Sequence, residues 1–271
     1  MNHTLIFLTT LALTLVPAMG IANPLIPAGT QIQSPKVNEL SGVIPASIAG
    51  YWGINDSGNS SSLYCFNSQG ALLHEIPLKK VNNVDWEAIT RDQDGYLYIG
   101  DFGDNDAQRK TYTIHKIHET HALAQKGETT KTYTFRYEDR KSRNCEAFFV
   151  QNGRLYLISK EPKESDTPSL FCIDSLQEKG PAIARRVGPM AITGRVTDVA
   201  YSSTHNLVVV LTKKQFFTFS FQQERDLLQA PQNTQSFKLG KCEGICFDGD
   251  TMILTNEKGG IWQWPLQLVT R

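Results

Sequence analysis

Acidic residues recur along this chain of 271 residues in one kind of local setting. Each is followed by small or apolar residues, and then by a second apolar run. The recurring acids are Glu39 in NELSGVI, Glu87 in DWEAIT, Glu146 in NCEAFFV, Asp198 in VTDVAYS and Glu243 in KCEGICF. Carboxylates held close together raise one another's pKa or recruit cations. The recurrence therefore predicts a common site at which negative charge has to be neutralised.

A second set of polar residues stands where the second apolar runs end. These residues are Asp56, Asp101, Lys160, Lys213 and Asn256. Carboxylate and amide oxygens are the ligands that Ca²⁺ prefers, and the two lysines could neutralise part of the acidic set by ion pairing. We expect the five recurring acids and Asp101 to bind a divalent cation, with calcium as the tentative metal.

Further residues are expected to contact a ligand rather than the metal. Asp85 precedes Glu87 by two positions, and alternate residues of a strand face the same side. An anionic ligand would need basic partners. The predicted ligand-binding residues are Asp56, Asp85, Arg109, Lys160, Lys213 and Asn256. The open alternative is that the repeated acids only cap turns or bind neighbouring backbone amides.

The sequence assigns no catalytic residue. No G-x-S-x-G motif is present. None of the six histidines falls among the recurring acids or the polar strand ends, which argues against a histidine general base. Whether the chain is an enzyme is left open at this point.

Short apolar runs rich in β-branched and aromatic residues surround these positions. Gly, Asn, Asp and Ser bound the runs, which is typical of strands and hairpins. Up to four such runs follow one another in each repeat, and the acids lie 45 to 59 residues apart. This period predicts an all-β fold, a β-propeller with five blades of four antiparallel strands, with six blades as the alternative.

The two ends of the chain are expected to complete one blade together. Only 28 residues follow Glu243, which is enough for three strands. The segment AGTQIQSP, residues Ala28 to Pro35, could supply the fourth strand. Because side chains alternate along a strand, the first strand of each blade should turn its acid toward the central channel.

The first 22 residues read as a signal peptide, with an apolar run that ends in Gly20-Ile21-Ala22. The run is short for a membrane span, although an uncleaved anchor is the alternative. Residues 23–271 then form a single domain in the periplasm or outside the cell. The five cysteines do not fit a disulfide framework, so we expect buried free thiols.

Charge composition limits the classes of partner. Lys plus Arg and Asp plus Glu number 27 each, so no basic excess would attract nucleic acid. The expected partner is a small molecule or a protein at the channel mouth. We expect a monomer with no membrane span once the signal peptide is removed.

Several of these motifs occur together in a known family. They are ELSGV (39–43), NDSG (55–58), DWEAI (85–89), GDFGDN (100–105) and CEGICF (242–247). With them the chain resembles the SdiA-regulated family of exported bacterial β-propellers, and also the phytase-esterase-like and NHL-type propellers. The resemblance implies a propeller over the whole mature chain and a calcium ion near the axis.

The chain departs from the enzymes of these groups in two respects. It lacks the acidic calcium and phosphate motifs of β-propeller phytases, and it lacks the axial histidines of paraoxonase-like enzymes. Catalytic residues therefore do not transfer. The favoured hypothesis is a calcium-binding propeller that recognises a ligand or a partner. The alternative is a calcium-dependent hydrolase of a lactone or phosphoester, with Glu87, Glu146 or Glu243 as metal ligand or base and with Lys160, Lys213 and Arg109 on the anionic group.

Overall fold

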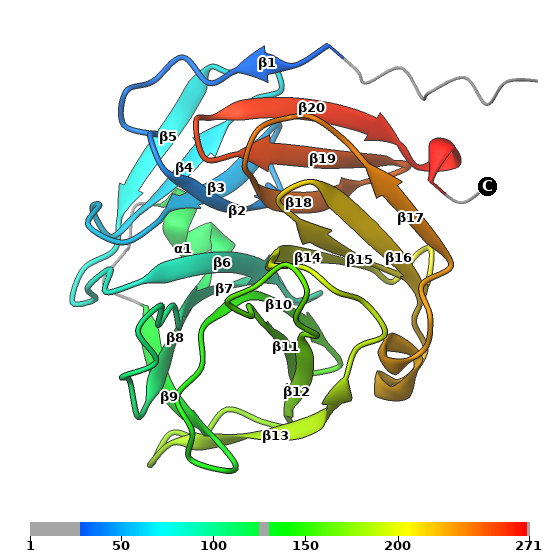
Figure 1. Cartoon of the computed structure of the whole chain (residues 1–271). Coiled ribbons are helices and arrows are strands. Elements are labelled where there is room, and N and C mark those ends of the chain that lie inside the picture. The colour runs from blue at the N-terminus through cyan, green and yellow to red at the C-terminus, as the bar shows by residue number, and fades with distance from the viewer. Residues whose placement is uncertain (1–27, 125–129, 270–271) are drawn as a thin grey trace, which may run out of the picture.

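The regular structure of the described residues is almost entirely β-strand (Figure 1). The computed structural model describes residues 28–124 and 130–269. Within these two ranges the helical elements are α1 (Glu119–Leu123) and two short 3-10 helices, η2 (Glu224–Leu228) and η3 (Leu266–Leu268). The prediction of an all-β fold is confirmed. The predicted signal peptide, residues 1–22, lies outside the described residues.

Two of the sheets are simple meanders of four antiparallel strands. The first contains β2 (Leu40–Pro45), β3 (Tyr51–Asn55), β4 (Ser62–Phe66) and β5 (Leu72–Pro77). The second contains β14 (Val196–Ser202), β15 (Leu207–Thr212), β16 (Gln215–Ser220) and β17 (Asn233–Ser236). In both sheets the second strand is buried along its whole length, which explains why YWGIN and LVVVLT carry almost no polar residues.

A third sheet has eight strands and consists of two antiparallel halves. One half contains β6 (Trp86–Arg91), β7 (Tyr96–Asp101), β8 (Tyr112–His118) and β9 (Lys131–Tyr137). The other contains β10 (Cys145–Gln151), β11 (Arg154–Ser159), β12 (Ser169–Ile173) and β13 (Ala182–Pro189). The outer strands β9 and β13 run parallel, with Phe135 opposite Ala182, and this pair joins the halves.

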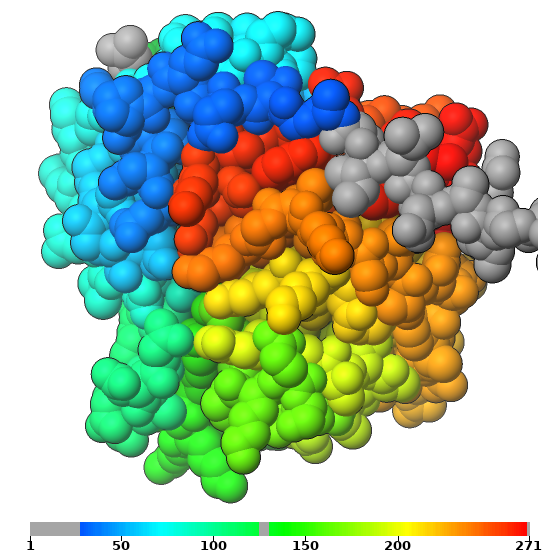
Figure 2. Space-filling view, turned by 45° about the horizontal axis from the view of Figure 1, so that its top comes forward, coloured from blue at the N-terminus to red at the C-terminus, as the bar shows by residue number. Residues whose placement is uncertain are grey.

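The fourth sheet joins the two ends of the chain. It contains β18 (Cys242–Asp248), β19 (Thr251–Asn256), β20 (Gly260–Pro265) and β1 (Thr30–Gln31). β1 pairs antiparallel with β20, with Thr30 opposite Ile261. Figure 2 shows the N-terminal segment in blue along the C-terminal strand in red. The predicted N-terminal strand of the last sheet is thus present.

The residues after β1 also bridge two sheets. The amide of Ile32 donates to the carbonyl of Gly259 over 2.8 Å, beside β20. The amide of Gln33 donates to the carbonyl of Gly70 over 2.8 Å, in the turn between β4 and β5. We call residues 30–33 the N-terminal latch, because they bind the first and the last sheet together.

The first strand of every meander lies at the centre of the molecule (Figure 1). These inner strands are β2, β6, β10, β14 and β18. β2 contacts β6, β6 contacts β10, β10 contacts β14, β14 contacts β18, and β18 returns to β2. A closed ring of inner strands, with the other strands stacked outward, is the architecture of a β-propeller.

The hydrophobic core lies between neighbouring sheets rather than at the axis. Between the two halves of the eight-stranded sheet it is aromatic, and the rings of Phe102 and Phe148 meet edge to face with centroids 5.1 Å apart. Trp52 and Trp86 are fully buried between the first sheet and the next. Burying a large apolar side chain stabilises the fold by about 1.5–3 kcal/mol, so these contacts fix the angle between sheets.

All five cysteines are free and buried, as the sequence predicts. Over residues 28–124 and 130–269, no helix has both the length and the apolar character needed to cross a bilayer.

Candidate functional site

Every inner strand carries an irregularity at the same place in its pairing with the second strand. One residue has no partner across the ladder, which is the mark of a β-bulge. The bulged residues are Gly42, Glu87, Glu146, Thr197 and Glu243. A bulge turns a side chain away from the regular alternation. Three of the recurring acids therefore stand at equivalent bulges of the propeller.

These three glutamates line a cavity of about 400 Å³ at the end of the ring where the inner strands begin. We call it the axial charged pocket. The residues proposed from the sequence that line it are Glu39, Asp56, Glu87, Glu146, Lys160, Lys213 and Glu243. The structure thus brings together most of the acids and both lysines of the two sequence patterns.

Three carboxylates could share a cation at one side of this pocket, two of them from its lining and the third, Asp85, beside it. One oxygen from each of Asp56, Asp85 and Glu87 lies within 4.8 Å of the others. We call these residues the carboxylate triad. Asp85 and Glu87 both lean against Gly103, where any β-carbon would overlap their oxygens. The absence of a side chain at Gly103 is what gives the two carboxylates room.

Glu87 is the least satisfied member of the carboxylate triad. Only 4% of the residue is exposed. Among the described residues no hydrogen bond or ion pair reaches its carboxylate, and its oxygens are not among the fully enclosed unpaired atoms, so they face the axial charged pocket. Buried carboxylates are normally paired or bound to a metal, so this one points to a cation or a proton.

The electrostatics of the carboxylate triad favour the neutral forms of Glu87 and Asp85. Burial raises the pKa of Glu87 well above its usual range, and Asp56 raises it further, while Lys160 opposes the shift. Burial also raises the pKa of Asp85, followed by repulsion from Asp56, while a hydrogen bond from Ser57 opposes the shift. A bound cation would relieve this repulsion.

The other side of the axial charged pocket carries the positive charge. Lys160 is ion-paired with Glu146, and both side chains are buried. Lys213 Nζ lies 4.0 Å from Glu243 Oε1. Burial lowers the pKa of Lys160. Burial raises the pKa of Glu243, although the positive charges of Lys160 and Lys213 act to lower it. The pocket is therefore divided between an acidic side and a basic side.

Five residues proposed from the sequence lie outside the lining of the axial charged pocket: Asp85, Asp101, Arg109, Asp198 and Asn256. Asp101 accepts the amides of Val84 and Asp85 and pairs with Arg109 over 2.9 Å, so it lies behind Asp85 and holds it in place. Burial acts to raise the pKa of Asp101, but His115 and Arg109 outweigh burial and the pKa is lowered.

Arg109 and Asn256 hold loops. Arg109 donates to the carbonyls of Gly103 over 2.9 Å and Asp101 over 3.0 Å. Asn256 donates to Leu239 over 3.0 Å and accepts the amide of Gly260 over 2.8 Å. The structure thus does not bring the guanidinium of Arg109 or the amide of Asn256 to the lining of the axial charged pocket.

Glu39 and Asp198 differ from the other recurring acids. Glu39 lies on the exposed rim, where it accepts a hydrogen bond from Asn59 over 2.7 Å. Asp198 is buried and accepts the amides of Val199 and Ile245, each over 2.8 Å, so it joins β14 to β18. Burial raises the pKa of Asp198 well above its usual range. Asp198 fits the alternative of an acid bound to backbone amides.

Arg195 is a pocket residue that the sequence patterns missed. It lines the basic side, and its buried Nε has no hydrogen-bond partner within the described residues. Arg195 stands two positions before the bulge at Thr197, the same place that Asp85 takes before Glu87 and Lys241 before Glu243. An alignment on the bulges would have found it, but Thr197 carries no acid to mark the position.

Comparisons with known proteins add three distant similarities. No family model matches the chain, and no curated protein matches it. A virginiamycin B lyase from Staphylococcus aureus is 12% identical over 86% of this chain and 68% of its own, with a TM-score of 0.45. A chain of a nidogen/laminin complex is 10% identical over 84% and 76%, with a TM-score of 0.49.

The third similar structure is XC5397 from Xanthomonas campestris, described as a gluconolactonase. It is 9% identical over 91% of this chain and 99% of its own, with a TM-score of 0.47. Similarities at this level carry no argument about what this chain binds or catalyses. The strands and side chains of this chain alone define its fold and its candidate site.

Proposed function

We propose that the protein binds a divalent cation, calcium as the tentative metal, at the carboxylate triad and uses the axial charged pocket to recognise a ligand or partner. The observation that carries this proposal is the buried, unpartnered carboxylate of Glu87 between Asp56 and Asp85. Hard oxygen donors of this kind suit Ca²⁺. The triad would hold the metal, and a bound cation would offer an anionic or carbonyl oxygen a positive contact.

The partner is a small molecule or protein group with an anionic oxygen. Lys160, Lys213 and Arg195 line the basic side of the axial charged pocket, opposite the triad. A ligand oxygen between the two sides would meet the cation on one side and ammonium or guanidinium donors on the other. The sequence suggested Arg109 for binding the anionic ligand, but Arg109 forms an ion pair with Asp101. We therefore assign that role to Arg195.

We extend the proposal to the number of blades, the export of the chain and its family. We count five blades, because the ring of inner strands closes after five members and β9 and β13 join two meanders only at their outer strands. The apolar N-terminal run supports export to the periplasm or beyond, and a monomeric state stays a prediction. Membership of the SdiA-regulated family stays a prediction from the sequence motifs.

Calcium-dependent stability tests the metal site. Metal-free protein titrated with Ca²⁺ should gain roughly 5 °C in Tm at a hundredfold excess over Kd. Glu87→Gln should abolish the gain. Glu224→Gln, at an outer ion pair with Arg185, should keep it. An equal gain in wild type and Glu87→Gln would refute the proposed site, even if calcium binds elsewhere.

A hydrolase is the second candidate, and one observation favours it. A carboxyl group of raised pKa faces a lysine of lowered pKa inside one pocket, a pattern that is common at catalytic sites. The cation would polarise the carbonyl or phosphoryl oxygen of a lactone or phosphoester. Water would add and the ester C–O or P–O bond would break, giving an acid and an alcohol.

Turnover measurements separate the two candidates. Aryl esters, lactones and phosphoesters should be tested with calcium and with EDTA, in wild type and in Glu87→Gln. EDTA-sensitive turnover that Glu87→Gln lowers at least about a hundredfold would establish the hydrolase. Calcium binding without turnover of any of these classes would leave the recognition function.

A further inference from the structure

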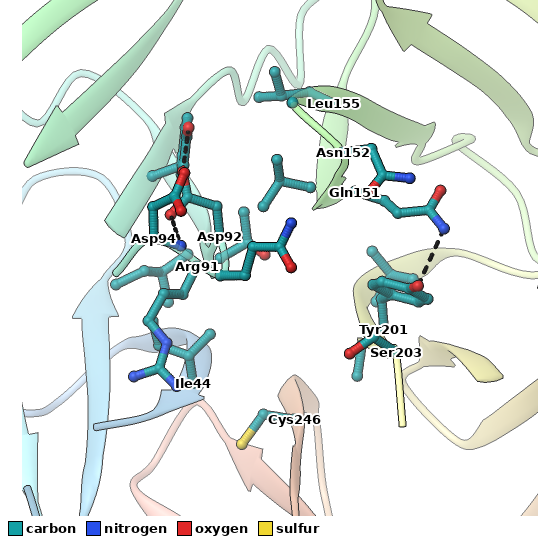
Figure 3. A pocket seen from close by; sticks show the side chains of 18 of the residues that line it. Ile44, Arg91, Asp92, Asp94, Gln151, Asn152, Leu155, Tyr201, Ser203 and Cys246 are labelled. Carbon is teal, nitrogen blue, oxygen red and sulfur yellow. Dashed lines mark hydrogen bonds between the residues drawn. The ribbon is translucent and has the colours of Figure 1, made fainter. Parts of the chain in front are cut away.

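A second cavity opens at the opposite end of the ring, where the inner strands end (Figure 3). Its volume is about 670 Å³, and no lining residue is shared with the axial charged pocket. We call it the distal pocket. The hairpin turn at Asp92–Asp94, the turn at Gln151–Gly153 and the end of β14 form its rim.

The lining near the axis is apolar and regular. Each inner strand contributes one β-branched aliphatic side chain: Ile44, Ile89, Val150, Val199 and Ile245. All five residues are at most 7% exposed. Only the edges of these side chains reach the cavity, so a ligand that enters the distal pocket meets a small apolar floor at the centre and a larger polar surface around it.

The charged groups of the distal pocket are balanced. Two cations, Arg91 and Lys116, and two carboxylates, Asp92 and Asp94, line it. Arg91 is paired with the buried Glu119 over 3.1 Å. Asp92 accepts the hydroxyl of Tyr98 over 2.8 Å and lies 3.8 Å from Lys116. The pocket has no excess charge to attract an ion.

Neutral donors and acceptors face these groups across the cavity (Figure 3). Gln151 Nε2 donates to the hydroxyl of Tyr201 over 3.1 Å. That bond leaves the carbonyl oxygen of Gln151 to accept and the proton of Tyr201 to donate, side by side. The ring of Tyr201 packs against Phe149 and Phe221 with centroids 5.5 Å away, so the hydroxyl is held in place. Ser203 lies beside it.

We propose that the distal pocket binds a neutral, polyhydroxylated small molecule, namely a saccharide of one or two rings. An adjacent donor and acceptor match a pair of neighbouring hydroxyl groups, and an aliphatic surface matches the apolar face of a sugar ring. The volume falls within the range of about 300–1,000 Å³ that small-molecule pockets occupy. The balanced charge favours a neutral sugar over a sugar acid or a phosphate.

Isoleucine methyl resonances can locate such binding. Glucose, galactose, maltose and cellobiose should be titrated into methyl-labelled protein up to about 10 mM, at which a Kd near 1 mM is readily seen. Glucuronate and inorganic phosphate serve as charged probes. We expect at least one neutral sugar to shift the methyl signals of Ile44, Ile89 and Ile245. Ile114 in β8 and Ile158 in β11 are buried and do not line the distal pocket, so they should stay unshifted.

Two tyrosine variants decide the role of the hydroxyl pair. Tyr201→Phe keeps the packed ring but loses the hydroxyl, so it should weaken sugar binding about tenfold, while losing the bond from Gln151 should lower the Tm by no more than about 4 °C. Tyr96→Phe, at an exposed tyrosine outside the distal pocket, should bind as wild type does. The proposal fails if no neutral sugar shifts the three methyl signals, if only the charged probes do, or if Tyr201→Phe binds like wild type.

Discussion

Glu87 shows how one side chain can combine several constraints. The β-bulge removes it from the strand ladder, burial removes it from water, and Asp56 and Asp85 surround it with like charge. Each constraint disfavours a bare carboxylate. The position is thus compatible with a protonated acid or a bound cation, and the choice between the two depends on what the pocket holds.

Asp198 makes a pH prediction at the same scale. Its pKa in the folded protein lies well above the usual 3.8, so the folded state binds more protons between the two values. Its contribution to stability should therefore fall as pH rises through that window. In urea unfolding of calcium-free protein, the free energy of wild type minus that of Asp198→Asn should decrease as pH rises from about 4. A constant difference would contradict this.

Lys160 predicts a large effect on folding stability. Its side chain is 8% exposed and that of its partner Glu146 is 4% exposed. Breaking a buried pair by removing one partner typically costs about 3–5 kcal/mol, so Lys160→Met should be strongly destabilised in urea unfolding. Adding Glu146→Gln should recover much of the loss.

The matched control is a surface pair at the edge of the same mouth. The side chains of Lys241 and Glu257 are 59% and 31% exposed. Lys241→Met should change the free energy of unfolding by less than about 1 kcal/mol. Equal effects of the two lysine variants would mean that the Lys160 pair is hydrated.

At the scale of elements, the bulge is the unit that repeats. The sequence predicted the inner strands, the chain closure and the acids at Glu87, Glu146 and Glu243, because strand patterns and acid spacing are local. It aligned Glu39 and Asp198 with them, although Gly42 and Thr197 occupy the equivalent bulges. A bulge adds one residue without a sequence marker, so the side-chain direction at those two positions could not be read from spacing.

The N-terminal latch gives a prediction at this scale. Gly70 has a φ of +84°, and a β-carbon there would overlap the carbonyl of Gln31. Gly70→Ala should therefore destabilise the protein by strain and by displacement of the latch. Gly180→Ala, at a φ of +74° with no atom near the added carbon, measures strain alone, expected at about 1 kcal/mol.

Comparing the two glycine variants isolates the latch. Gly70→Ala should lose at least about 1 kcal/mol more free energy of unfolding than Gly180→Ala. Amide hydrogen exchange in β20 should also speed up in Gly70→Ala, because the latch no longer covers that edge. If the two variants lost equal stability, the contact between Gly70 and Gln31 would contribute nothing.

For the whole molecule, the buried thiols offer a test of compactness. Burial raises the pKa of Cys65 and Cys172 to about 11 and that of Cys145 and Cys242 to about 12, and it raises the pKa of Cys246 well above the usual 9.0. A thiol-specific reagent at pH 8 should label none of the five in the native state and all of them in urea. Labelling of any native thiol would indicate local opening between two sheets.

The strand pattern and the spacing of the repeats were sufficient to predict an all-β propeller. The division of the axial charged pocket into an acidic and a basic side was not predictable in the same way. Arg195 reaches the pocket only because the inner strands form a ring, and residues distant in sequence then meet at one mouth. The distal pocket has the same origin, since its aliphatic lining takes one residue from each inner strand.

The N-terminal latch also has a consequence for how the protein is made. Thr30 must pair with Ile261, which leaves the ribosome almost a whole chain later. The ring cannot close during synthesis, and until it does the partner edge of β20 is unformed and β1 has nothing to pair with. Such a long-range contact slows folding. Until it forms, the unpaired strand edges of the growing chain are exposed and prone to aggregation. The molecule becomes a propeller only after its last strand is complete.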